Sequence, residues 1–275
     1  MSNQLKVIFS ISLMLSLIFT GYYIKDFRID ASSDSLVSQN DVDFQYFSYY
    51  QNIFPTKNSL ILAIKSDNKI DKILLKEIEK ISNKLVDLPE VNSVFSINKA
   101  PILILNNTNL IDLANNNYET IINTKLDFQD VLHEFGNSPI YSDQIINKNQ
   151  NITSIVIYLE DNFKVKDLKE NKSLYLSQGK YYRIKTEIDS ERNQLITKIR
   201  NIINSSNQNF TYYLGGVEMI SNDIITYVKN DILTFSIIVL SIIILILFLI
   251  FKRIKWVFTI LFTSIISVYF TIGLA

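Results

Sequence analysis

The C-terminal part of the chain, residues 223–275, most constrains what this sequence can fold into. It holds two apolar runs without a charged side chain, residues 232–251 and 256–275, and a basic connector separates them. About twenty apolar residues at about 1.5 Å each cover a hydrocarbon core of about 30 Å, and in lipid only a helix satisfies its own backbone over that distance. The sequence therefore predicts two transmembrane helices joined by a turn at residues 252–255, with a polar linking helix at residues 222–231 before them.

A third apolar run, residues 7–24, is flanked by Lys6 and Lys25. A cleavable signal peptide needs small residues before its cleavage site, whereas Phe19 occupies the −3 position of a cut after Gly21. We therefore expect residues 1–25 to hold an uncleaved transmembrane helix. The last apolar run stops at residue 275 without a polar flank, so we also expect the chain to be a fragment of a longer protein or half of a split one.

The basic connector predicts the orientation of the chain, because Lys and Arg accumulate in short cytoplasmic loops. Lys252, Arg253 and Lys255 place the turn in the cytoplasm, and by parity the N-terminus lies there too. Residues 26–231 are then extracytoplasmic. We expect a multi-pass protein of a bacterial inner membrane with a large periplasmic domain.

Charge and cysteine content limit the partners of this domain. All 27 acidic residues of the chain lie between Asp26 and Asp231, and the mildly acidic balance of that segment argues against nucleic acid as a partner. The chain contains no cysteine, which is compatible with an oxidising compartment but does not identify one. The segment is long enough to bury a sizeable core.

Hydrophobic periodicity predicts an α+β fold for residues 26–221. Four apolar runs are typical of strands: residues 60–64, 91–97, 152–159 and 209–214. Residues 70–88 and 187–204 show the spacing of amphipathic helices. Strand, helix and strand in each half predict two βαβ units that build a four-stranded, ferredoxin-like sheet with its helices on one face.

The segments outside these two units have weaker patterns. We expect a linker and then a short helix within residues 26–50, whose aromatic side chains serve packing rather than recognition. The charged, tyrosine-bearing composition of residues 163–185 predicts a surface excursion, a segment that leaves the core and lies on the surface of the domain. Between the units we expect three segments: a short strand at residues 102–105, a polar loop at 106–117 and a helix from Ile121 that stops at Gly136.

The sequence lacks a recognisable catalytic constellation. It contains one histidine, His133, and neither a G-x-S-x-G sequence nor a phosphate-binding G-x-x-x-x-G-K-[ST] sequence. His133 is expected in the last turn of its helix, where no second histidine or cysteine is available to complete a metal site. We therefore predict no catalytic, cofactor-binding or metal-binding residue, and a protein that is not an enzyme.

The order of these parts resembles the RND superfamily of exporters, and within it the MMPL branch that includes the hopanoid-associated transporters. The matching pieces are residues 30–36 after the first span, residues 54–64 at the first strand, and residues 214–255, which begin Leu-Gly-Gly-Val-Glu. The paired glycines fit either a role specific to the family or a turn that needs a positive φ.

This resemblance implies a proton-driven exporter of lipids or other hydrophobic substrates, whose extracytoplasmic porter domain contains ferredoxin-like subdomains. It also implies further spans, because the proton-relaying acidic residues of the family lie in a later one. The implied partners are the lipid bilayer, a hydrophobic substrate, the remaining transmembrane part or a split partner, and a second copy in a homo-oligomer.

Two other classes of protein stay open. An ABC-type permease with a large periplasmic domain would need a separate ATPase and a cytoplasmic coupling helix, which the turn at residues 252–255 does not supply. A membrane-anchored periplasmic sensor or binding module would place a soluble domain after the second span, where this chain has a third apolar run.

Overall fold

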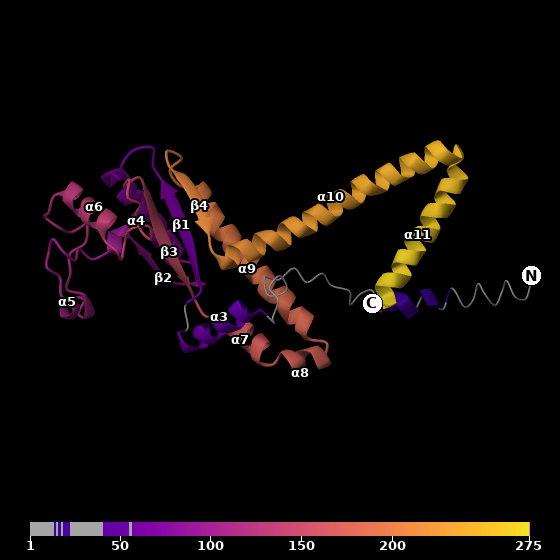
Figure 1. Ribbon diagram of the computed structural model, residues 1–275, viewed down its shortest axis with the longest axis horizontal. Coiled ribbons are helices and arrows are strands. Elements are labelled where there is room, and N and C mark those ends of the chain that lie inside the picture. The colour runs from indigo at the N-terminus through magenta and orange to yellow at the C-terminus, as the bar shows by residue number, and fades with distance from the viewer. Residues whose placement is uncertain (1–13, 15, 18, 23–40, 55–56, 275) are drawn as a thin grey trace, which may run out of the picture. The chain divides into compact units, whose positions relative to one another are not determined.

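The computed structural model of the chain describes residues 14, 16–17, 19–22, 41–54 and 57–274. The chain forms two compact units, one made of Ser38–Ile224 and the other of Met1–Val37 together with Ile225–Ala275. The first unit contains a four-stranded sheet with its helices, and the second contains long apolar helices (Figure 1).

The sheet has the order β2-β3-β1-β4, with every neighbouring pair antiparallel. Its strands are β1 (Ser59–Lys65), β2 (Val91–Ser96), β3 (Ile152–Leu159) and β4 (Thr211–Gly215). Leu62 of β1 lies opposite both Ile155 of β3 and Leu214 of β4, which fixes the register at the centre of the sheet. Because β3 lies between β1 and β2, those two strands run parallel, which is the split βαβ arrangement of a ferredoxin-like sheet. The four strands predicted for the sheet, and the sheet itself, are confirmed.

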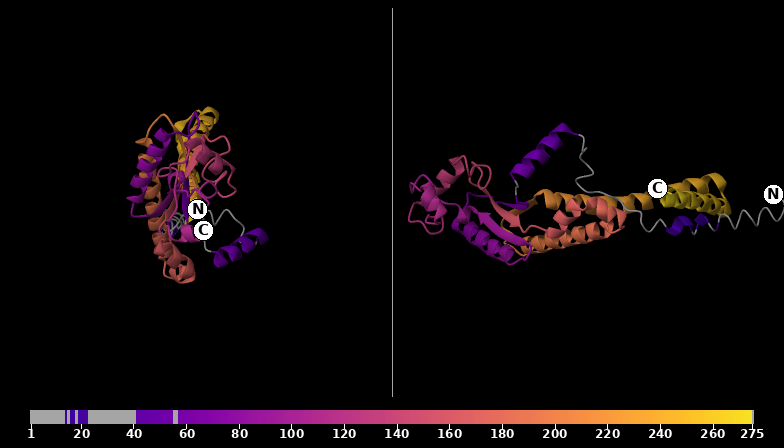
Figure 2. Two further views of the ribbon diagram at one scale, coloured as in Figure 1. Left: turned by 90° about the vertical axis from the view of Figure 1, so that its left-hand side faces the viewer. Right: turned by 90° about the horizontal axis from the view of Figure 1, so that it is seen from below.

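Two amphipathic helices complete the core of this unit. Helix α4 (Lys72–Val86) connects β1 to β2, and α9 (Tyr181–Asn204) connects β3 to β4. They lie side by side on one face of the sheet (Figure 2). Their apolar stripes are buried in the same cluster as the strands, through Leu74, Ile78, Ile81 and Leu85 of α4 and Leu195, Ile196 and Ile199 of α9. The Asp71 side chain caps α4 by accepting a hydrogen bond from the Leu74 N–H.

The insertion between β2 and β3 differs from the prediction. The expected strand at residues 102–105 is wrong: these residues form an irregular segment and a turn, and the preceding residue, Pro101, makes an isolated bridge to Thr120. The polar loop contains a short helix, α5 (Leu110–Ala114), with Asn109 as its cap. Helix α6 (Phe128–Asn137) begins later than expected because Asp127 accepts hydrogen bonds from the first amides of that helix.

Three other segments differ in detail from what the sequence predicts. Gly136 lies inside α6, whose C-terminal cap is Ser138, so it does not stop the helix. The expected surface excursion is helical, with α7 (Phe163–Glu170), α8 (Lys172–Ser177) and the first residues of α9. The expected aromatic helix is α3 (Val42–Ile53), in which Tyr46 and Tyr50 contact each other at 4.7 Å between ring centroids but remain exposed. The linker expected before it, at residues 26–40, lies outside the described residues.

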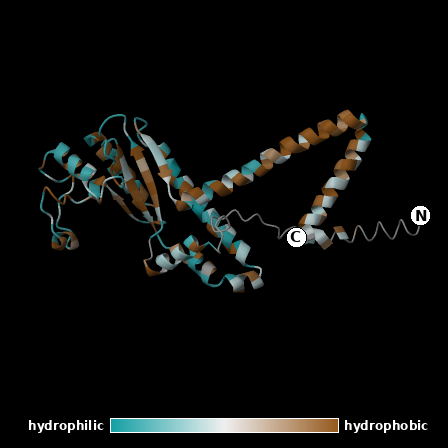
Figure 3. Ribbon diagram, viewed as in Figure 1, coloured by the Kyte–Doolittle hydropathy of each residue, from teal (hydrophilic) through white to brown (hydrophobic). Residues whose placement is uncertain are grey.

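Helices α10 (Val217–Phe251) and α11 (Ile254–Leu274) carry the two C-terminal apolar runs. By length and composition, Val217–Phe251 and Ile254–Gly273 could each cross a membrane. Figure 3 shows α10 changing from mixed character in its first part to mainly hydrophobic character in its second part. The expected linking helix and second span are therefore parts of one continuous helix. Of the expected first span, only residues 14, 16–17 and 19–22 are described, and they are helical.

Candidate functional site

The connection from β4 into α10 depends on a glycine. Gly216 has a φ of +131°, which side-chain-bearing residues rarely adopt. A Cβ atom at this position would lie 2.9 Å from the Ser59 carbonyl oxygen and 2.9 Å from the Leu60 Cδ2. Gly216 therefore permits both the sharp turn and the close approach of the backbone to β1. Of the two meanings considered for the paired glycines, the structure supports the turn with positive φ.

Two arginines of α9 hold the first turns of α10, in what we call the α9–α10 junction. Arg192 forms ion pairs with Glu218 and, at 3.3 Å, with Asp189. Arg200 donates from Nη2 to both carboxylate oxygens of Asp223, at 2.9 and 2.7 Å. Glu218 lies in the first turn of α10, where a negative charge also interacts favourably with the helix dipole.

The inner side of this first part of α10 is buried. Ser221 and Asn222 are 5% and 7% exposed, and Met219 packs against the hydrophobic core. The Asp223 carboxylate is itself only 19% exposed, while the Arg200 side chain is 44% exposed. Because Ser38–Ile224 forms one compact unit, these contacts make the start of α10 an integral part of the sheet domain. The junction therefore holds residues 217–224 of α10 to the domain, and within the described part of the chain it contains no group of side chains arranged to hold a metal ion.

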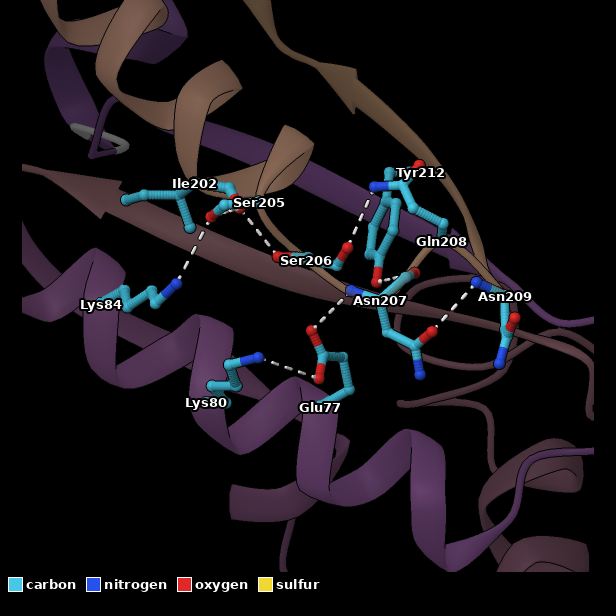
Figure 4. A network of polar contacts seen from close by, with 10 residues as sticks. All are labelled: Glu77, Lys80, Lys84, Ile202, Ser205, Ser206, Asn207, Gln208, Asn209 and Tyr212. Carbon is cyan, nitrogen blue, oxygen red and sulfur yellow. Dashed lines mark hydrogen bonds and ion pairs between the residues drawn. The ribbon is translucent and has the colours of Figure 1, made fainter.

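A polar network joins α4 to the loop after α9 (Figure 4). The nearly buried Glu77 carboxylate accepts a hydrogen bond from the Asn207 N–H at 3.0 Å and lies 3.7 Å from the Lys80 Nζ. The Tyr212 hydroxyl donates to the Asn207 carbonyl at 3.0 Å. Burial, and to a smaller degree the Glu77 charge, raise the pKa of Tyr212 to about 12. The network fixes the turn that leads into β4 and thus into the junction.

A second buried carboxylate organises the insertion between β2 and β3. Glu134 of α6 is 8% exposed and accepts three backbone N–H groups, those of Leu103 and Ile104 on Oε1 at 2.7 and 3.0 Å, and that of Leu105 on Oε2 at 2.9 Å. These amides would be the donors of a strand, so their use by Glu134 explains why the predicted strand does not form. Nearby, burial and then the charges of Glu134 and Tyr118 raise the pKa of Tyr141 to about 12.

The comparison with protein families bears on the sheet domain, the junction and the apolar helices together. The model of the MMPL family matches residues 130–275, which is more than half of the chain. The chain belongs to the MMPL family. No curated protein matches it. The match begins in α6 and includes β3, α9, β4, the α9–α10 junction, α10 and α11, so the junction is part of the MMPL region of the chain. Members of this family are membrane transporters, which confirms the coarser part of the resemblance.

In the unit of this MMPL chain that contains α11, small residues permit close helix contact. A Cβ atom on Gly273 of α11 would lie 2.7 Å from the Thr20 carbonyl oxygen, and one on Gly21 would overlap the Tyr269 hydroxyl. The Tyr269 hydroxyl donates to the Leu17 carbonyl at 3.1 Å. Small residues at such contacts are typical of packed membrane helices. Residues Leu17, Thr20 and Gly21 of the first apolar run therefore pack against α11.

His133, the histidine considered in the sequence analysis, contacts a neighbouring side chain of its own helix in the described structure. The His133 ring is exposed and lies within 3.3 Å of the Asn137 side-chain nitrogen. Among the described residues, no group of His, Cys, Asp and Glu is arranged to hold a metal ion. Sequence reasoning did not single out Glu134, Arg192 or Arg200. Glu218, two residues after Gly216, was the one available signal for the junction, because a strand-to-helix turn places it in the first helical turn.

Proposed function

We propose that this chain is the N-terminal portion of a proton-driven RND-type exporter, of the hopanoid-associated transporter type, that moves lipids or other hydrophobic molecules. The observation that carries the proposal is the membership of residues 130–275 in the MMPL family. The continuous helix α10, which begins inside the sheet domain and becomes mainly apolar, supports it.

In this proposal the chain is a multi-pass protein of a bacterial inner membrane. Residues 1–25, 232–251 and 256–275 are the spans, with residues 222–231 linking and residues 252–255 as a cytoplasmic turn. Residues 26–221 form the periplasmic porter domain. The basic side chains of Lys252, Arg253 and Lys255 support this orientation.

The α9–α10 junction would carry movement between the porter domain and the membrane. Because Gly216, Arg192 and Arg200 fix the first turns of α10 to the domain, a displacement of that domain would displace the start of the helix with it. A helix transmits such a displacement along its axis because its backbone hydrogen bonds hold its length. The proton-relaying acidic residue is proposed to lie in a later span, on the same longer chain or on a split partner, and the complex to act as a homo-oligomer.

Export can be tested with the gene at its own locus. Deletion should increase retention of the hydrophobic dye Nile red, and the unaltered gene should restore efflux. A protonophore should abolish that efflux at constant ATP, whereas an ABC-type permease would instead respond to ATP depletion. Unchanged dye retention, together with a downstream reading frame that encodes a soluble signalling domain, would refute export and favour the sensor.

A variant links the test to the junction. Arg200→Gln removes the charge that holds Asp223 and should lower efflux at unchanged protein level. Lys166→Gln is the matched control, because Lys166 forms only an exposed pair with Glu170 at 4.0 Å. Equal efflux from both variants would refute the proposed role of the junction while leaving export itself standing.

A further inference from the structure

The connection between α8 and α9 carries a local excess of positive charge. Residues 172–185, which we call the basic tip, contain Lys172, Lys180, Arg183 and Lys185 and no acidic residue. This is unexpected in a chain whose charges sum to zero. Lys172, Lys180 and Arg183 are exposed, and no ion pair of theirs is present among the described residues.

Apolar and aromatic side chains are exposed between these charges. Leu174 is 50% exposed, Leu176 44% and Tyr182 44%. Tyr181 and Tyr182 contact each other edge to face at 5.3 Å, and the Lys172 Nζ lies 5.9 Å from the centre of the Tyr181 ring. The basic tip therefore offers cations together with large amphipathic side chains, which is the composition of segments that bind at a membrane surface.

Three acidic side chains next to the basic tip have their own partners in α7, α8 and α9. Lys164 of α7 lies 2.7 Å from Glu187 and 2.6 Å from Glu191 of α9. Asp167 of α7 accepts a hydrogen bond from the Tyr175 hydroxyl at 2.6 Å. These carboxylates are thus used to hold α7, α8 and α9 together, and among the described residues none of them forms an ion pair with Lys172, Lys180 or Arg183.

The backbone of the basic tip is fixed by the turn after α8. Gly179 has a φ of +65°, and its N–H donates to the Leu176 carbonyl while the Lys180 N–H donates to the Tyr175 carbonyl, at 3.1 and 2.9 Å. This pair of bonds is a Schellman motif, which ends a helix with a glycine in the left-handed conformation. The turn therefore presents Leu176 and Lys180 in one defined arrangement.

We propose that the basic tip binds the anionic headgroup surface of a phospholipid bilayer. Charge complementarity supports this occupant, since an anionic leaflet attracts clustered Lys and Arg, and the exposed leucines and tyrosines can enter the headgroup region. The chain belongs to a family of membrane transporters, so a bilayer is always close to it. The proposal does not depend on export, and it adds a surface contact by the sheet domain to the membrane insertion of the apolar helices.

The experiment uses the full chain in lipid nanodiscs. Because the chain has no cysteine, Ser177→Cys provides a unique site for an NBD fluorophore at the exposed end of α8. Nitroxide-labelled lipids should quench the probe in nanodiscs that contain phosphatidylglycerol, and much less in pure phosphatidylcholine. Quenching should fall in about 0.5 M salt, because screening then limits the range of the attraction between exposed charges to a few ångströms.

A matched pair of variants tests the charges themselves. The labelled chain is given three substitutions together, Lys172→Gln, Lys180→Gln and Arg183→Gln. Each lost charge should lower the equilibrium constant for contact with the bilayer surface about fivefold, so the three together should lower it about a hundredfold. Lys69→Gln, Lys72→Gln and Lys76→Gln together remove three other exposed lysines and should leave quenching unchanged. Equal thermal unfolding of the two triple variants excludes misfolding as the cause of a difference.

Three results would overturn the proposal. The first is equal quenching in the two lipid compositions, and the second is equal loss of quenching in the two triple variants. The third is a probe that stays unquenched in both lipids, which would show that the basic tip does not contact the bilayer.

Discussion

Arg200 of α9 donates from a single guanidinium nitrogen to both carboxylate oxygens of Asp223 in α10, at 2.9 and 2.7 Å. With the Arg192–Glu218 ion pair, this contact ties the first turns of a largely apolar helix to the ferredoxin-like sheet domain. Partly exposed ion pairs of this kind contribute about 0–1 kcal/mol each to stability. The contribution of the α9–α10 junction therefore lies more in holding the first turns of α10 in place than in the stability of the domain.

Replacing Arg200 tests this distinction. Arg200→Gln should lower the free energy of unfolding by about 1 kcal/mol or less, because the pair is partly screened by solvent. It should nevertheless increase hydrogen exchange in the first turns of α10, at residues 217–224, when the full chain is measured in detergent by mass spectrometry. Lys166→Gln should leave that exchange unchanged. Equal exchange in the two variants would show that the ion pair does not hold α10.

Gly216 offers a sharper test of the strand-to-helix turn. Gly216→Ala should lower the free energy of unfolding by more than about 2 kcal/mol, since it combines a strained φ with a clash against the β1 backbone. Gly179→Ala is the control, because its φ is also positive but no atom lies within 4 Å of the added Cβ. That variant should lose about 1–2 kcal/mol from the left-handed conformation alone. Equal losses in thermal unfolding would contradict the steric part of the argument.

Glu134 is expected to determine the structure of the insertion. Glu134→Gln places an NH₂ group against backbone N–H donors and should cost about 1–3 kcal/mol. The amides of residues 103–105 should then exchange faster with solvent, which mass spectrometry can locate. Glu79→Gln, at an exposed position on α4, is the control. If residues 103–105 kept their protection in Glu134→Gln, the carboxylate would not be what holds this segment.

The sheet domain was predictable from sequence where periodicity and burial agree. Residues 152–159 were predicted as a strand and are β3, because this β-branched run lies at the centre of the sheet and is paired on both sides. The parallel direction of β1 and β2 also followed, since a helix of the length of α4 connects strands that run parallel. Local pattern and tertiary structure give the same answer in these segments.

The predictions failed where a distant side chain decides the backbone conformation. Residues 102–105 form an uninterrupted apolar run, which is typical of a strand. The backbone N–H groups of residues 103–105 instead donate hydrogen bonds to the Glu134 carboxylate, about thirty positions away in the sequence. The ion pairs of Arg192 and Arg200 could not be predicted from the sequence either, because each joins α9 to α10 and no local sequence pattern relates these two helices. In the apolar helices, length and composition predicted α10 and α11 but not their packing partners.

Tyr212 makes stability depend on pH in the alkaline range. Its pKa is raised to about 12 in the folded chain, chiefly by burial, so the folded state holds the proton more strongly than the unfolded state does. The stabilisation is complete below the unfolded pKa of about 10 and is lost as the pH rises from there through about 12. Tyr212→Phe should therefore flatten the decline of stability above pH 10, measured by urea unfolding in detergent at several pH values. An unchanged alkaline slope would assign the decline to other tyrosines, of which Tyr141 is the first to test.

Gly273 tests the packing of the first apolar run against α11. Gly273→Leu brings its side chain against the backbone carbonyl of Thr20, which cannot move without displacing the helix, and should cost about 1–3 kcal/mol. Gly21→Ala meets only the end of the Tyr269 side chain, which can rotate away and lose its hydrogen bond to Leu17. The loss for Gly21→Ala should therefore be smaller, about 1 kcal/mol. Thermal unfolding of the full chain in detergent gives the comparison, and a larger loss for Gly21→Ala would mean that these two helices do not pack through Gly273.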